Sequence, residues 1–189
     1  MSFKSKFEEF QTVNVNDSLI LRKADPDKDC NAWCKMYRDE ETFRYYGGID
    51  GGDHRTPDGM KVILRNQNRD FEKVRMYAWV IADVKTDKAL GRIHFSSFEN
   101  NNKVANIGYW LGRESWGKGI MSACINSAVK FGFSYLELER IYTTVHIDNV
   151  GSWKALEKNG FLREGLLRHS FYLSKKLHDC YMYSRLHTD

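Results

Sequence analysis

The sequence predicts an α/β fold in which helices cover both faces of a single mixed, mostly antiparallel β-sheet. Strand-like runs at residues 76–84, 90–98 and 105–112 are separated by short polar breaks, the pattern of an antiparallel meander. From Lys118 onward apolar residues recur every four positions, which indicates a helix with one buried face. A β-branched run at residues 140–147 then returns the chain to the sheet.

The complete predicted order is strand, helix, helix, three strands, helix, strand, helix and two strands. Asp25-Pro26 supplies an N-cap and a first-turn proline for the first helix. Asn159-Gly160 closes the last helix as a left-handed C-cap, and a hairpin follows it. The elements outside the central run are expected at residues 18–24, 29–37, 56–68, 152–161, 164–173 and 179–186.

Length and composition indicate one globular domain. A chain of 189 residues suits one full core, so residues 1–189 are expected to form a single domain with its core at about 10–187. No apolar stretch approaches a membrane span, and the first residues lack a signal-peptide pattern. The four cysteines form no Cys-x-x-Cys pair, and metal-ligand spacings are absent. These features predict a reduced, cytoplasmic protein that uses no metal and binds no membrane.

The net charge of +4 is compatible with an anionic small ligand or an RNA. The basic residues are scattered along the chain, which is typical of a solvated surface. We therefore expect no direct binding to nucleic acid.

A glycine turn between a strand and a helix is the first candidate site. The segment NIGYWLGRESWGKGI (residues 106–120) delivers Gly117-Lys118-Gly119 at the start of the helix. The first backbone N–H groups of a helix have no internal partners, and its dipole favours negative charge there. Glycines let a ligand approach the backbone, and Lys118 adds a cation. A purely structural tight turn explains the triplet equally well. The P-loop pattern is absent, and Ser122 replaces the third glycine of G-x-G-x-x-G.

A longer pattern includes this turn. The segment IGYWLGRESWGKGI resembles the acetyl-CoA motif of the GNAT N-acetyltransferase superfamily, and more narrowly of its RimJ/RimL-type branch, which acetylates ribosomal-protein N-termini. The core motif Q/R-x-x-G-x-G/A falls on residues 116–121, and DNVGSWKALEKNGF (residues 148–161) resembles the second motif, N-x-x-S-x-x-x-L-E-K-x-G-F. The resemblance extends over roughly residues 10–187. It implies the GNAT fold and an acyltransferase whose cosubstrate is acetyl-CoA.

The resemblance also implies how the cosubstrate binds. The strand at residues 109–111 would diverge from its neighbour at a bulge and pair with the pantetheine arm through backbone groups. The N–H groups of residues 117–122 would hold the pyrophosphate, and Asn149 would hydrogen-bond the pantetheine or fix the splayed strands. The implied cofactor-binding residues are Tyr109, Trp110, Leu111, Gly117, Lys118, Gly119, Ile120, Met121, Ser122 and Asn149.

The chain departs from the family pattern at four positions. Trp116 occupies the Gln/Arg position, and Met121 stands where glycine or alanine is usual. Leu156 replaces a tyrosine that protonates the departing thiolate in many of these enzymes. Asn106 replaces a glutamate that is a candidate general base in this branch. Both standard proton-transfer groups are therefore absent.

Three side chains are candidates for the missing proton-transfer roles. Ser152 aligns with the family's serine and is the first candidate to donate a hydrogen bond to the leaving sulfur, although it could equally be the N-cap of the last helix. His146, at the end of its strand, could relay a proton, and His94 is a weaker candidate. A lone histidine in a strand is more often packed or solvent-facing. We expect the aromatic residues Tyr109, Trp110 and Trp116 to pack in the core and at its rim.

The leading hypothesis is an acetyl-CoA-dependent N-acetyltransferase that works by direct attack of a primary amine in a ternary complex. An α-amine with a pKa of about 7.7–8.0 is roughly one-third neutral near pH 7.5, whereas a lysine-like amine is about 0.1% neutral. The absent base therefore favours a protein N-terminal α-amine, of ribosomal-protein type. A polyamine or an aminoglycoside is the alternative acceptor, and it needs an acidic pocket. Residues that could supply that charge are Glu40, Glu41, Asp50, Asp53 and Glu99.

Two other classes of function stay open: a non-catalytic acyl-CoA-binding sensor and a generic nucleotide-binding protein. The first would bind acetyl-CoA without releasing a thiol, and the second would prefer ATP to CoA. The partners expected for the leading hypothesis are acetyl-CoA, an amine acceptor and a second copy of the chain in a homodimer. The glycine-rich stretch at residues 47–58 is a candidate lid over the acceptor.

Overall fold

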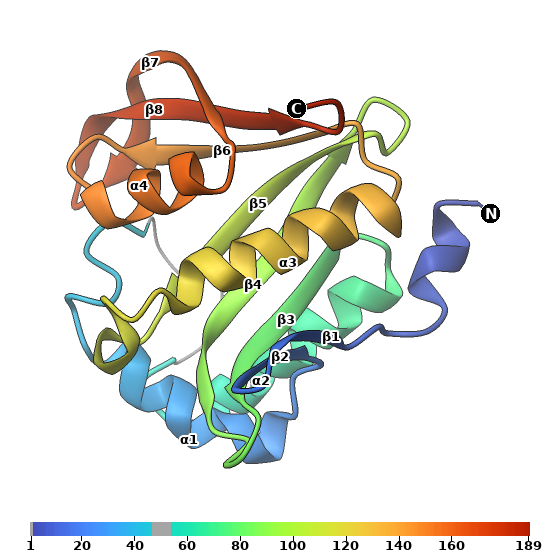
Figure 1. The fold of residues 1–189 in the computed structure, drawn as a ribbon. Coiled ribbons are helices and arrows are strands. Elements are labelled where there is room, and N and C mark those ends of the chain that lie inside the picture. The colour runs from blue at the N-terminus through green and yellow to red at the C-terminus, as the bar shows by residue number, and fades with distance from the viewer. Residues whose placement is uncertain (1, 47–53) are drawn as a thin grey trace.

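A computed structural model describes residues 2–46 and 54–189. Its eight strands form one sheet in the order β1-β2-β3-β4-β5-β6-β8-β7 (Figure 1). Every neighbouring pair is antiparallel except β5 and β6, which run parallel. The strands are β1 (Val13–Asn16), β2 (Leu19–Arg22), β3 (Met76–Asp83), β4 (Ala89–Glu99), β5 (Val104–Leu111), β6 (Arg140–His146), β7 (Leu162–Leu173) and β8 (Lys176–Leu186).

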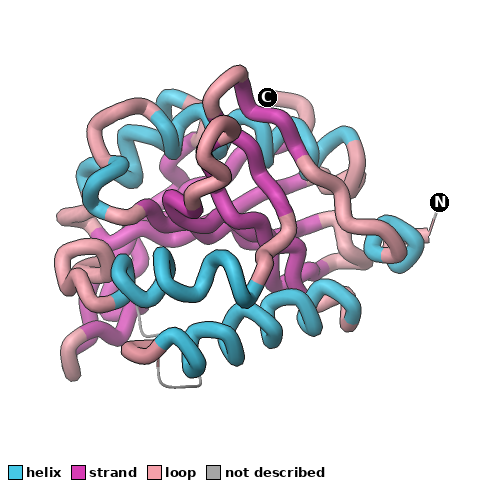
Figure 2. Tube along the Cα trace, turned by 90° about the horizontal axis from the view of Figure 1, so that it is seen from below, coloured by secondary structure: helices cyan, strands magenta, loops and turns pink. Residues whose placement is uncertain are grey.

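Helices cover both faces of the sheet, as predicted (Figure 2). On one face, α1 and α2 pack on Val80, Ala82 and Trp110. On the other face, α3 and α4 enclose the larger core cluster. The predicted apolar face of α3 is confirmed, because Cys124 and Ala128 are fully buried. The helices are α1 (Pro26–Tyr37), α2 (Pro57–Glu72), α3 (Ile120–Ser134) and α4 (Val150–Lys158), with short 3-10 turns at Lys4–Phe7 and Arg113–Ser115.

The structure corrects the predicted elements near the N-terminus. The predicted first strand is the second, because the preceding β1 pairs with β2 across a tight turn. Its four residues alternate between half-buried and exposed, so the sequence has no apolar run that would predict this strand. The predicted start of the first helix is confirmed: it begins at Pro26, and the Asp25 carboxylate accepts the N–H groups of Asp27 and Lys28. The second helix continues to Glu72, four residues beyond its predicted end.

The turn chemistry of the second motif is as predicted. Gly160 follows α4 with a φ of +76°, a left-handed conformation that L-residues seldom adopt. The four cysteines are free and buried. No helix in the described ranges is long and apolar enough to cross a membrane. The single-domain boundary stays a prediction, and residues 47–53 of the candidate lid lie outside the described residues.

Candidate active site

The site begins where β5 and β6 separate. The two strands pair only between Val104–Asn106 and Arg140–Tyr142. At the last pair, the Asn106 side-chain amide donates to the Tyr142 carbonyl at 3.3 Å. Beyond this point the strands diverge (Figure 1). The predicted divergence is present, whereas the register shift lies in β4, between Ser96 and Glu99, rather than in β5.

The open edge of β5 presents backbone groups to the gap. The Gly112 N–H donates to the Leu90 carbonyl of β4. In an antiparallel ladder the direction of the backbone groups alternates, so the N–H and C=O of Trp110 face β4, whereas those of Tyr109 and Leu111 face the gap. The Leu111 carbonyl already accepts the Trp116 indole N–H at 2.8 Å. The backbone groups left for a ligand are therefore both groups of Tyr109 and the N–H of Leu111.

The glycine turn presents a row of unused donors. Gly117 and Gly119 have φ values of +71° and +73°, and a Cβ built on either would meet no protein atom within 4 Å. Gly119 is the N-cap of α3. Among the hydrogen bonds of the described residues, none uses the backbone N–H groups of residues 117–122. The turn is therefore open and rich in donors, which suits an anion at a helix N-terminus.

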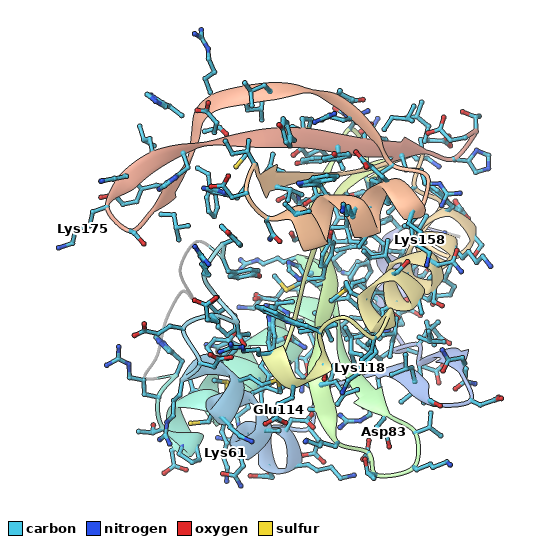
Figure 3. All side chains as sticks on the ribbon, turned by 60° about the vertical axis from the view of Figure 1, so that its left-hand side comes forward. Lys61, Asp83, Glu114, Lys118, Lys158 and Lys175 are labelled. Atoms are coloured by element: carbon cyan, nitrogen blue, oxygen red, sulfur yellow. The ribbon has the colours of Figure 1, made fainter. Side chains whose placement is uncertain are left out.

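Lys118 does not point its charge into this site. Its ammonium donates to the Glu114 carbonyl at 2.8 Å, and both residues lie on the turn before α3 (Figure 3). Of the ten expected cofactor-binding residues, it alone is not part of the cavity wall described next. Lys118 can therefore favour an anion at the glycine turn only through its nearby positive charge, without a direct contact in this arrangement.

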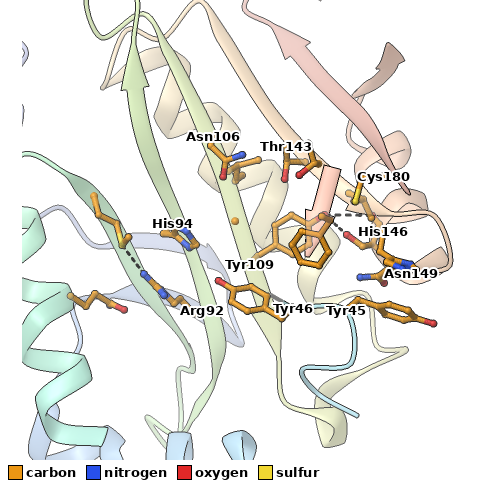
Figure 4. A pocket seen from close by; sticks show the side chains of 18 of the residues that line it. Tyr45, Tyr46, Arg92, His94, Asn106, Tyr109, Thr143, His146, Asn149 and Cys180 are labelled. Atoms are coloured by element: carbon orange, nitrogen blue, oxygen red, sulfur yellow. Dashed lines mark hydrogen bonds between the residues drawn. The ribbon is translucent and has the colours of Figure 1, made fainter. Parts of the chain in front are cut away.

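Two cavities flank the gap between β5 and β6. The first, the glycine-turn cavity, has a volume of about 560 Å³ and includes the other nine expected cofactor residues. The second, the histidine cavity, has a volume of about 520 Å³ and includes His94 and His146 (Figure 4). The residues that line both cavities are Tyr45, Tyr46, Tyr109, Asn149 and Ser152. The two spaces therefore meet at these side chains.

A hydroxyl pair lies at this junction. The Tyr109 Oη is 2.9 Å from the Ser152 Oγ, and either atom can be the donor. Burial raises the pKa of the Tyr109 phenol, so it stays protonated through the neutral range. From the sequence alone, only packing and backbone roles are expected for Tyr109. Its hydroxyl was missed because the contact joins β5 to α4, which no local pattern reveals.

Asn149, rather than Ser152, is the N-cap of α4. The Asn149 Oδ1 accepts the Ser152 N–H at 3.3 Å, which corrects the alternative role considered for Ser152. The Ser152 hydroxyl is thereby left to Tyr109. The Asn149 Nδ2 makes no hydrogen bond within the described chain, so it can donate to a ligand in either cavity.

His146 is held by contacts on both ring nitrogens. Its Nδ1 accepts the Asp148 N–H at 3.2 Å, so the neutral ring carries its proton on Nε2, which lies 3.1 Å from the His178 Nδ1. Burial lowers the pKa of His146, so the neutral form of the ring dominates at any pH above the usual histidine pKa. The Nε2 proton of His146 is therefore directed at His178 on β8. In this arrangement, however, neither nitrogen of His146 offers a free lone pair to the cavity.

His94, on β4, lines the histidine cavity, and its ring lies beside Gly108 of β5. Its Nδ1 is buried and has no hydrogen-bond partner in the described chain. Burial lowers the pKa of His94 well below its usual value, and the positive charge of Arg92 lowers it further. A base with so low a pKa removes protons poorly near neutral pH. His94 is therefore a neutral polar residue that lines the cavity, and it is not a strong base.

The His94 ring depends on the missing side chain of Gly108. A Cβ on Gly108 would lie 2.4 Å from the His94 Cε1, so we expect Gly108→Ala to push the ring aside and to lower the free energy of unfolding by about 1–3 kcal/mol. Urea unfolding measures this change. Gly165→Ala is the control, because a Cβ there meets nothing within 4 Å. Equal stability of the two variants would contradict the predicted clash.

The expected acidic residues do not converge on the histidine cavity. Its one carboxylate in the described chain is that of Asp70, which lies 4.0 Å from the Arg75 guanidinium. Glu41 lines the glycine-turn cavity instead, and Glu99 accepts the Tyr142 hydroxyl at 2.9 Å. Glu40 is exposed and lines neither cavity, while Asp50 and Asp53 lie outside the described residues.

Comparison with known proteins identifies the family. The family model described as "Acetyltransferase (GNAT) domain" matches residues 18–162. The chain belongs to the GNAT acetyltransferase family. The predicted family and fold are therefore confirmed, and this GNAT chain is an N-acetyltransferase that uses acetyl-CoA.

Relatives and solved structures agree with this assignment. The uncharacterized N-acetyltransferase p20 of Bacillus licheniformis is 31% identical over 170 residues, which cover 90% of this chain and 93% of that protein. The ribosomal-protein-serine acetyltransferase of Escherichia coli is 33% identical over 112 residues, 59% of this chain and 63% of that protein. The structure of Mycobacterium smegmatis RimJ in complex with CoA-disulfide shares the fold with a TM-score of 0.82 at 22% identity, covering 93% of this chain and 87% of that one.

The residues of this GNAT chain fit acetyl-CoA. Unused N–H groups at residues 117–122 match a diphosphate, and the free backbone groups of Tyr109 match the amides of a pantetheine arm. The open space beside Gly119 admits the ligand close to the backbone. The thioester would then lie at the junction of the two cavities, beside Ser152 and Tyr109.

Proposed function

We propose that the chain transfers the acetyl group of acetyl-CoA to the α-amine of a protein N-terminus. The observation that supports this proposal is the set of side chains in the histidine cavity. Its described residues include two histidines that stay neutral, one carboxylate and no strong base. Such a cavity suits an amine that is partly neutral without help, as an α-amine is near pH 7.5. Polyamines and aminoglycosides need more negative charge than Asp70 provides. The similarity to a ribosomal-protein-serine acetyltransferase supports the same class of acceptor.

The proposed mechanism is direct attack in a ternary complex. Acetyl-CoA supplies the activated thioester when it is bound. The glycine turn and the open edge of β5 orient that thioester at the cavity junction, so proximity provides much of the rate. The free N–H of Tyr109 or Leu111 can polarise the acetyl carbonyl. Water in the histidine cavity carries the amine proton away, because His146 and His94 offer no strong base.

The departing sulfur receives its hydrogen bond from the hydroxyl pair. We assign Ser152 as the donor to sulfur and Tyr109 as the group that donates to Ser152 behind it. The residue at the family's tyrosine position, Leu156, is fully buried in the core and cannot serve. The pair thus occupies, from two different elements, the role that one tyrosine has elsewhere in the family.

The test is CoA thiol release with a panel of amines. The panel contains peptides with free alanine or serine N-termini, the same peptides with a blocked N-terminus and an internal lysine, spermidine, and an aminoglycoside. Release with the free N-termini alone supports the proposal. Release with spermidine or the aminoglycoside contradicts it. Binding of acetyl-CoA without release for any amine favours the sensor alternative. A cytoplasmic location and a homodimer remain predictions that accompany this proposal.

The pH dependence follows from the lowered histidine pKa values. Because the pKa values of His94 and His146 are depressed, both rings are neutral above about pH 6.5 and add no inflection there. We expect kcat/KM for an N-terminal peptide to rise with pH, with an inflection near pH 8, and to level off above about pH 9, where the acceptor amine is mostly deprotonated. Initial rates between pH 6 and 9.5 measure the profile. An inflection near pH 6.5 that disappears in His146→Gln or His94→Gln would show that a histidine titrates in its usual range.

A further inference from the structure

Arg92 is a cation in the wall of the histidine cavity. It lies two residues before His94 on β4, so both side chains occupy the same face, about 7 Å apart along the strand. The cavity includes both residues, and Figure 4 shows Arg92 beside His94 and Tyr46. Arg92 is half-buried, in contrast to the exposed arginines of the neighbouring α2.

The Arg92 guanidinium has no anionic partner in the described chain. Its Nη2 donates to the Met76 sulfur at 2.6 Å, and its buried Nε has no hydrogen-bond partner. A thioether is a weak acceptor and carries no charge. No carboxylate of the described residues lies within 4.0 Å of Arg92, and Asp70, in the same wall, is associated with Arg75.

Two other arginines of the sheet are paired with carboxylates, whereas the half-buried Arg185 donates to the Asn159 carbonyl at 2.8 Å. Arg22 forms ion pairs with Asp29 at 2.7 Å and with Asp87 at 2.6 Å. The guanidinium of Arg140 binds Glu164. A half-buried cation without such a partner loses hydration and gains little in return. Its field is also felt in the cavity, because it helps to lower the pKa of His94.

We propose that Arg92 binds a carboxylate of the acceptor, so that the enzyme prefers amines with a carboxylate close to the reacting nitrogen. A guanidinium fork matches a carboxylate in a bidentate geometry. Arg92 pairs with Trp110 across the ladder, next to Tyr109 at the cavity junction, and neighbouring strands are about 4.8 Å apart. A carboxylate at Arg92 is therefore within one or two peptide residues of an amine at the junction. This inference rests on the proposed function, since it assigns the histidine cavity to the acceptor.

The experiment compares acceptors that differ only in charge. Peptides beginning Ser-Asp and Ser-Asn are acetylated by the wild-type enzyme, by Arg92→Gln and by Arg69→Gln, which removes an exposed arginine of α2 outside the cavity. We expect wild type and Arg69→Gln to favour Ser-Asp by about tenfold in kcat/KM, in line with a charged hydrogen bond. Arg92→Gln is expected to bring this ratio close to one. Free serine and serinamide form a second pair, and a preference for serine that Arg92→Gln removes would identify a free amino acid as the source of the carboxylate.

A binding measurement separates this inference from the proposed function. Titration calorimetry with CoA present gives the Kd of the acetylated products, acetyl-Ser-Asp and acetyl-Ser-Asn peptides, without turnover. About tenfold tighter binding of the acidic peptide, lost in Arg92→Gln, supports the inference even if no peptide is a substrate. Equal affinities, or a ratio unchanged in Arg92→Gln, would overturn it even if both peptides are acetylated. If no peptide is acetylated but the acidic product still binds about tenfold more tightly than the neutral one, only the proposed transfer to an α-amine is contradicted.

Discussion

Replacing Gly119 by alanine is expected to weaken acetyl-CoA binding by at least about tenfold while the fold persists. The Cβ would meet no protein atom within 4 Å, so it projects into the space assigned to the diphosphate. Losing one charge-assisted hydrogen bond to a backbone N–H costs about 1.5–3 kcal/mol, and tenfold in affinity corresponds to about 1.4 kcal/mol. Titration calorimetry with CoA measures the effect directly.

Backbone strain is a second consequence of the same change, and it can be controlled. Alanine at a φ of +73° costs about 1–2 kcal/mol of stability. Gly160→Ala imposes similar strain at +76°, beside the Arg185 side chain and away from both cavities. We expect it to lower stability without changing the Kd for CoA. Gly119→Asn tolerates the left-handed conformation but still carries a Cβ, so it should weaken CoA binding as alanine does. Wild-type affinity in both Gly119 variants would show that the diphosphate lies elsewhere.

The sequence was sufficient to predict seven of the eight described strands, the four described α-helices and the family, because local patterns and motifs determine them. The period change at Lys118 and the cap residues Asp25 and Gly160 depend on neighbours within a few residues. The strand β1 was missed because a short edge strand buries little and shows no apolar run. The end of α2 was misplaced because Phe71 continues its buried face beyond the predicted boundary.

The candidate site was only partly predictable, because its chemistry depends on contacts between distant elements. The glycine turn follows from a motif, but the Tyr109–Ser152 pair joins positions 43 residues apart. The contacts of His146 also require β8, which supplies His178. One signal was available in the sequence: Arg92 and His94 alternate as polar residues with the apolar residues of the first part of β4. That alternation places both on one face, which is where the structure has the histidine cavity.

Tyr109→Phe and Ser152→Ala are each expected to lower kcat by about 100-fold with little change in the KM for acetyl-CoA. General acid catalysis typically contributes 10²–10⁴-fold, and we expect the lower end because a thiol with a pKa near 8.5 leaves readily. In the proposed mechanism Ser152 donates to the departing sulfur and Tyr109 donates to Ser152, while the cosubstrate is held by backbone groups that neither change removes. Steady-state kinetics with a saturating acceptor measure kcat and KM separately.

Matched hydroxyl removals show whether the loss is specific. Tyr142→Phe removes a phenol that binds Glu99 outside both cavities, and Ser134→Ala removes a hydroxyl that bonds within α3. Neither change is expected to alter kcat by more than about twofold. Unchanged kcat in Tyr109→Phe and Ser152→Ala would exclude the hydroxyl pair as the donor to sulfur.

The double variant distinguishes a connected pair from two independent groups. If Tyr109 acts through Ser152, removal of either hydroxyl interrupts the same path, and the Tyr109→Phe, Ser152→Ala enzyme should be no slower than the slower single variant. If each hydroxyl reached the sulfur independently, the two losses would multiply to about 10⁴-fold. The 2.9 Å contact between the hydroxyl oxygens, across β5 and α4, favours the first result. A connected pair would explain how this chain dispenses with the tyrosine that Leu156 replaces, since a core residue cannot regain that role without disrupting the packing of α4.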